Sequence, residues 1–109
     1  MNMPRFRYWD MIKKMLDDKE EVKRALVTIS IEKALLGIGK PTYDEVLSVL
    51  NTQYHCYLPD CYEHPEYLNE ILRKLYGNAG KVITKSITTQ LEEFGQHKLI
   101  KRFLEVICN

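Results

Sequence analysis

The chain has 109 residues, with 16 Lys and Arg against 15 Asp and Glu, which gives a formal net charge of +1. This is the length of one ordinary domain. The hydrophobic share of 45% argues against intrinsic disorder. The near-neutral net charge excludes a strongly basic arm or an acidic tail. No stretch approaches the roughly 18 apolar residues of a membrane span, no secretory signal is visible, and three cysteines in such a chain indicate a cytoplasmic protein without membrane contact.

The first expected helix covers about residues 5–17. Four apolar side chains recur there at helical spacing, with charged residues between them: Phe6, Trp9, Ile12 and Leu16. Such a stripe packs either on its own domain or on another chain. We predict that residues 1–19 carry an amphipathic dimerisation helix with this stripe as the partner interface, and that residues 20–109 form one helical domain.

The second expected helix, over about 20–36, is apolar on most of its circumference and is therefore expected to be buried centrally. One face carries Val22, Ala25, Leu26, Ile29 and Leu36, and a second carries Val27, Ile31, Ala34 and Leu35. The stretch 27–32 also alternates with period two and is rich in β-branched residues, which is typical of a strand. Because no turn residue follows it, we choose a helix, and the alternative is an α+β fold with a strand at 25–31.

A third helix is predicted to start at Pro41-Thr42 and to run to Tyr54. Thr42 and Glu45 have the spacing of a capping box, in which each side chain satisfies a backbone N–H of the first turn. Apolar residues follow at i, i+3, i+4 and i+7, so this is the clearest amphipathic helix of the chain.

Three more helices are predicted after it. One starts near Pro65 and ends at Gly77, since Pro suits a first turn and Gly suits the residue after a last turn. Asn78 is expected to cap the next helix, which runs to Phe94, and the last covers about 96–107. The predicted fold is an all-α, compact bundle of about six amphipathic helices with one irregular loop.

That irregular loop, residues 55–64, holds the densest group of potential metal ligands. Cys56, Cys61 and His64 would supply three zinc ligands, with His55 or Asp60 as a fourth. A disulfide between the two cysteines and a pair of buried, unreactive thiols are the other interpretations. We favour buried thiols, and we expect neither a metal nor an organic cofactor.

Charge is unevenly distributed along the chain. Residues 60–70 are acidic, whereas the stretch from 73 to 102 holds seven bases and two acids. The candidate anion or nucleic-acid patch consists of Lys81, Lys85, Lys98, Lys101 and Arg102. An ordinary solvated face, or attraction to the acidic stretch of the same or a neighbouring chain, explains the same residues. Recognition helices usually present Arg, Asn or Gln to base edges, whereas the candidates here are mainly lysines.

Four runs of the chain, at 34–37, 39–46, 56–68 and 75–78, carry a resemblance to a known family. The most specific is Cys-Tyr-Leu-Pro-Asp-Cys-Tyr-Glu-His-Pro at 56–65. Over about residues 25–108 the chain resembles the archaeal Nitrosopumilus output domain family of type five. The resemblance implies an intracellular archaeal output module of signalling proteins, and it brings no catalytic residue and no ligand.

The sequence shows no catalytic triad, no paired carboxylates at one site and no cofactor fingerprint, so we do not expect an enzyme. We predict a non-catalytic helical interaction module, a regulatory or signalling output domain that acts as a homodimer or on another protein. The alternatives are a nucleic-acid-binding regulator that uses the basic C-terminal helices and a small zinc-binding protein that uses the loop at 56–64.

Overall fold

The structure, a computed structural model, describes residues 20–109, so the predicted helix at 5–17 and its interface (Phe6, Trp9, Ile12 and Leu16) lie outside the described residues. Residues 20–109 form five α-helices and three short 3₁₀ turns, without a strand. The helices are α2 (Glu20–Ile38), α3 (Lys40–Tyr54), α4 (Pro65–Tyr76), α5 (Gly80–Leu91) and α6 (Lys98–Ile107). The all-α prediction is confirmed, and the α+β alternative is wrong.

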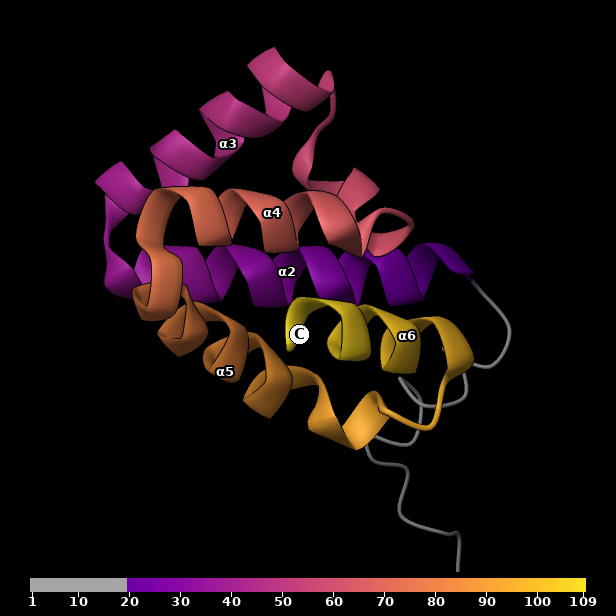
Figure 1. Ribbon diagram of the computed structural model, residues 1–109. Helices are drawn as coiled ribbons and strands as arrows, with labels where there is room; N and C mark the ends of the chain where they lie inside the picture. Colours follow the sequence, from indigo (N-terminus) through magenta and orange to yellow (C-terminus); the bar gives the residue numbers. More distant parts are fainter. Residues whose placement is uncertain (1–19) are drawn as a thin grey trace, which may run out of the picture.

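Helix α2 lies between other elements, as Figure 1 shows: α3 crosses above it, α5 runs below it, and both contact it. Its β-branched and hydroxyl residues fit a helix because Thr28 and Ser30 donate side-chain hydrogen bonds of 2.7 and 2.9 Å to carbonyls one turn earlier. The buried residues recur at helical rather than alternating spacing: Val27, Ser30, Ile31, Ala34 and Leu35.

The prediction that α2 is buried on most of its circumference is only half right. The face with Val27 and Ile31 is fully buried, but Ile29 is 50% exposed and Leu36 is 44% exposed on the opposite face. The physical reason is that α3, α5 and the 3₁₀ turn at Leu58–Tyr62 cover one side of α2. One apolar face of this helix is therefore open among the described residues.

The core draws on every helix and on the loop after α3. Helix α4 packs on α3, α5 and α6, so the second half of the chain closes over the first. The largest fully buried side chains are Tyr62, Phe103, Ile31, Leu35, Leu50, Leu68, Ile71, Ile87, Leu91, Ile100 and Ile107. No helix within 20–109 combines the length and the apolar character that crossing a bilayer requires.

The start of α3 differs from the prediction. The helix begins at Lys40 with Gly39 as its N-cap, and no side chain caps it. Thr42 therefore lies inside the first turn, and the predicted capping box with Glu45 is wrong. Pro41 explains the shift, because a proline is best placed at the first helical positions, where no partner for its missing N–H is needed.

The turn between α4 and α5 confirms two predictions and corrects a third. Pro65 begins α4, and Gly77 ends it with a positive φ of 55°, which favours glycine. Asn78 does not cap α5, because it lies in a 3₁₀ turn, Gly77–Ala79, and Ala79 is the N-cap without a side-chain bond. Helix α5 stops at Leu91, three residues before the predicted end, because the next residues tighten into a further 3₁₀ turn.

Candidate functional site

A cavity of about 780 Å³ lies between α4, α5 and the C-terminal end of α6. Its polar lining comes from three bases (Arg73, Lys81 and Lys85) and from the amides and hydroxyls of Asn69, Asn78, Thr84 and Thr88, and Leu72 and Ile107 add apolar surface. None of the described residues that line it has a carboxylate side chain. The cavity therefore combines three basic side chains with an apolar wall.

Helical periodicity explains why the polar residues of α4 and α5 line the same cavity. On α5 the lining residues Lys81, Thr84, Lys85 and Thr88 stand at i, i+3, i+4 and i+7, which is one face of a helix. On α4, Asn69 and Arg73 stand four residues apart and share a face in the same way. The two faces meet across the short turn at Gly77–Ala79.

Close packing at the start of α5 holds these two helices together. Gly80 is buried, and a β-carbon there would lie 3.1 Å from the Leu72 carbonyl oxygen and 3.3 Å from Leu72 Cβ. A β-carbon at position 80 would require Leu72 to move by a few tenths of an ångström, whereas glycine allows this approach of α5 to α4 without displacement.

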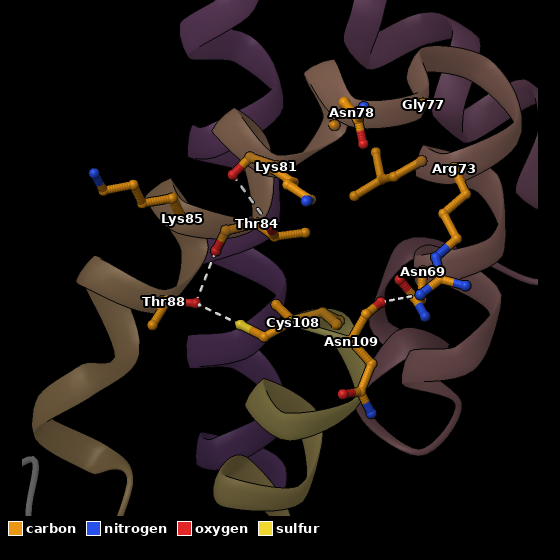
Figure 2. Close-up of a pocket in the computed structure, with 13 residues that line it drawn as sticks. Asn69, Arg73, Gly77, Asn78, Lys81, Thr84, Lys85, Thr88, Cys108 and Asn109 are labelled. Carbon is orange, nitrogen blue, oxygen red and sulfur yellow. Dashed lines mark hydrogen bonds between the residues drawn. The ribbon is translucent and has the colours of Figure 1, made fainter.

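Hydrogen bonds attach the end of α6 to both walls (Figure 2). Thr88 Oγ1 donates to the Thr84 carbonyl at 2.8 Å and lies 3.3 Å from Cys108 Sγ. The Arg73 guanidinium donates to the backbone oxygen of Asn109. These contacts fix the Arg73 side chain at the mouth of the cavity.

The predicted basic patch is divided between two places. Lys81 and Lys85 line the cavity, whereas Lys98, Lys101 and Arg102 are exposed on the first turns of α6, whose last turn reaches the cavity. At about 1.5 Å per residue, the two ends of α6 are roughly 14 Å apart. The sequence analysis omitted Arg73 from the patch, because no local pattern indicates that it shares a cavity with Lys81.

The cysteine and histidine loop does not form a ligand cluster. Cys56, Cys61 and Cys108 are free thiols, and nowhere in residues 20–109 do three or more His, Cys, Asp or Glu side chains gather around a metal-sized space. His64 is exposed and stacks on the Tyr67 ring, with 4.8 Å between centroids and Nδ1 3.1 Å from a Glu66 oxygen.

Burial governs the chemistry of the loop thiols. Cys61 has no exposed surface, and desolvation by burial raises its pKa from 9.0 to about 12. The Cys56 thiol is half-buried and donates to the Tyr54 carbonyl at 3.2 Å. A thiol with so high a pKa is neither a nucleophile nor a ready metal ligand.

The same loop is attached to the start of α2 by a polar network. Tyr62 donates to a Glu20 carboxylate oxygen at 2.7 Å, and Arg24 pairs with Glu63 and lies over the Tyr62 ring. Burial, followed by the bond to Glu20, raises the pKa of Tyr62. The hydrogen bonds from Lys23 and Tyr62 lower the pKa of Glu20, so the Glu20 carboxylate and the Tyr62 phenol favour the charge states in which they bond to each other.

A second surface feature lies on the open face of α2. Ala25, Ile29 and Leu36 are exposed there, and a shallow groove of about 380 Å³ runs between Ala25, Ile29 and Pro59. These three apolar residues share one face of α2, which also carries Glu32 between Ile29 and Leu36.

No family model matches the chain, and neither a curated protein nor a solved structure shows significant similarity to it. The function is therefore argued from the cavity, the loop and the α2 face themselves.

Proposed function

We propose that this protein is a non-catalytic helical interaction module that acts as a homodimer. The observation that carries the proposal is the exposed apolar row on α2, formed by Ala25, Ile29 and Leu36. We name these three residues the α2 stripe. The occupant that we propose for it is the N-terminal segment, residues 1–19, of a second copy.

The α2 stripe has the geometry of a helix-docking surface. At about 100° per residue, positions 25, 29 and 36 fall within roughly 40° of one another around the helix, and they span roughly 16 Å along it. Glu32 lies at the edge of the same sector, between Ile29 and Leu36 along the helix. Pro59 borders the groove beside the first two residues, and Glu21 and Arg24 supply a polar rim. An apolar centre with a polar rim is the usual anatomy of a protein interface.

The N-terminal segment complements this surface in length and chemistry. Its predicted stripe, from Phe6 to Leu16, spans roughly 15 Å if helical, and it presents two aromatic and two aliphatic side chains. Aromatic residues are enriched as interface anchors. We propose the α2 of a second copy, rather than the α2 of the same chain, as the docking surface.

The test is the mass of the full chain by light scattering after size-exclusion chromatography. We expect a dimer for the native sequence and at least a tenfold weaker dimer for Ile29→Glu, because a carboxylate would be buried against the aromatic stripe. Val82→Glu is the matched control, since Val82 is 61% exposed on α5 and lies outside the α2 stripe. It should dimerise as the native chain does.

Two results would contradict the homodimer. A monomeric native chain would mean that the segment packs on its own α2 or nowhere, and a dimer that Val82→Glu weakens as much as Ile29→Glu would place the interface elsewhere. A chain lacking residues 1–19 should be monomeric, because it lacks the proposed occupant.

The regulatory part of the proposal rests on the resemblance to the archaeal output domain family. A cytoplasmic location belongs to the same proposal, and the free state of all three cysteines supports it, because unpaired thiols are typical of a reducing compartment. Dimerisation through a terminal segment is a simple way for such a module to join identical chains.

A further inference from the structure

We infer that the cavity between α4, α5 and α6 binds a small organic anion, specifically a phosphate monoester with an apolar or aromatic body. Arg73 and Lys81 are the proposed anion-binding residues. This inference is independent of the homodimer, because the cavity shares no residue with the α2 stripe.

The first argument is charge. Figure 2 shows the Arg73 and Lys81 side chains extending from two helices toward the same space, whereas Lys85 extends away from it at the outer side of α5. None of these three bases pairs with a carboxylate side chain among the ion pairs of residues 20–109. Arg73 instead bonds the backbone oxygen of Asn109, so Lys81 is the base directed into the cavity whose charge has no partner within residues 20–109. Basic side chains that converge in a concave site focus an attractive potential for anions.

The second argument is the donor geometry. A guanidinium offers five N–H donors in a planar fork that matches phosphate oxygens, and Arg73 uses one of them to bond the Asn109 backbone oxygen. This bond holds the fork in place before a ligand arrives, which reduces the entropy cost of binding. Gly80 and Lys81, in the first turn of the 12-residue helix α5, add the positive end of the helix dipole.

The third argument is size and polarity. A cavity of about 780 Å³ is much larger than an inorganic phosphate requires, and it lies within the range of roughly 300–1,000 Å³ that is usual for small-molecule sites. Leu72 and Ile107 supply apolar contact for the rest of the ligand. The Thr84 and Thr88 hydroxyls already donate to backbone carbonyls, so they accept hydrogen bonds from a ligand rather than donate them.

The experiment is calorimetric titration of the full chain with four phosphate monoesters: phenyl phosphate, glucose 6-phosphate, glycerol 3-phosphate and adenosine monophosphate. Inorganic phosphate, phenol and adenosine are the reference probes. We expect at least one monoester to bind about tenfold more tightly than inorganic phosphate and than its own uncharged counterpart, as a charged hydrogen bond plus apolar burial implies.

The variants assign the binding to this cavity. Lys81→Gln should weaken the best monoester about tenfold, and Arg73→Gln should weaken it at least as much while circular dichroism verifies the fold. Lys98→Gln removes the same charge from α6 outside the cavity, and we expect less than about a twofold change from it, because exposed charges act weakly at a distance. Ile29→Glu, which tests the homodimer, should leave monoester binding unchanged.

Three outcomes would overturn the inference. The first is the failure of all four monoesters to bind more tightly than inorganic phosphate. The second is an equal loss of binding in Lys81→Gln and Lys98→Gln, which would reflect net charge alone. The third is displacement of the monoester by a 12-nucleotide single strand whose binding Lys98→Gln and Lys101→Gln also weaken, which would identify a nucleic-acid surface instead.

Discussion

At the scale of single residues, burial decides what the reactive side chains of the loop can do. Cys61 lies at the centre of the core cluster beside Leu58 and Tyr62 and has no exposed surface. Its thiol keeps its proton in the folded protein because a buried thiolate would lose hydration without gaining a compensating partner. The residue that the sequence offered as a metal ligand is therefore part of the packing.

This raised pKa predicts a loss of stability in alkali. The folded pKa of Cys61, about 12, lies above its ordinary value of 9.0. The contribution of the protonated Cys61 thiol to the free energy of unfolding is therefore complete below pH 9 and is lost as pH rises toward 12. At pH 10.5 the loss should approach about 2 kcal/mol, at 1.36 kcal/mol per pH unit. Urea unfolding at pH 7.5 and 10.5 measures it.

The control for this prediction is a comparison of two cysteine variants. Cys61→Ala should lower stability at both pH values through the lost packing, but it should show a smaller drop between them than the native chain. Cys108→Ala, at an exposed position, should keep the full drop. An equal drop in Cys61→Ala would mean that tyrosine ionisation alone causes the alkaline loss.

At the scale of elements, the contact between α4 and α5 depends on Gly80. We predict that Gly80→Ala destabilises the fold by about 1–2 kcal/mol, because the added methyl group is forced against the Leu72 backbone, which the core holds in place. Gly37→Ala is the matched control: it lies in the last turn of α2 with nothing within 4 Å of an added β-carbon. It should stabilise by up to about 1 kcal/mol.

Thermal unfolding of the two variants, followed by circular dichroism, gives the measurement. Equal effects of the two substitutions would show that intrinsic helix preference, and not the approach of α5 to α4, governs position 80. A loss of phosphate monoester binding in Gly80→Ala would further connect this contact to the shape of the cavity.

How far the sequence predicts these elements depends on which interactions define them. Local signals were sufficient for the helices at 65–76 and 98–107, because their apolar residues recur at helical spacing and Pro65 and Gly77 mark the ends of the first. The N-terminus of α3 was misplaced because Pro41 and Gly39 outweigh the Thr42 pattern. Two competing local signals cannot be ranked without the geometry of the turn.

The cavity and the open α2 face could not be predicted in this way, because both arise from packing between distant segments. Arg73 and Lys81 were visible as bases, but nothing local indicates that they face one space. Likewise, Ala25 and Val27 look equally apolar in the sequence, and only the positions of α3 and α5 decide which face of α2 is covered.

At the scale of the whole molecule, residues 20–109 contain a hydrophobic core cluster of their own. The described core cluster is drawn from α2 through α6. The start of α2 is held from within this part of the chain, because Tyr62 donates to Glu20 and Glu63 pairs with Arg24. Removal of residues 1–19 leaves all these contacts in place.

We therefore predict that a chain of residues 20–109 unfolds cooperatively, with a helical signal per residue close to that of helices α2–α6. Its midpoint should be independent of protein concentration, because a monomer has no association step. The full chain should instead show a midpoint that rises with concentration, since the proposed dimer couples folding to association. Thermal scans over a hundredfold range of concentration distinguish the two.

A gradual, non-cooperative transition in the shortened chain would show that residues 1–19 belong to the core. A concentration-independent midpoint in the full chain would exclude dimerisation coupled to folding, whatever the shortened chain does.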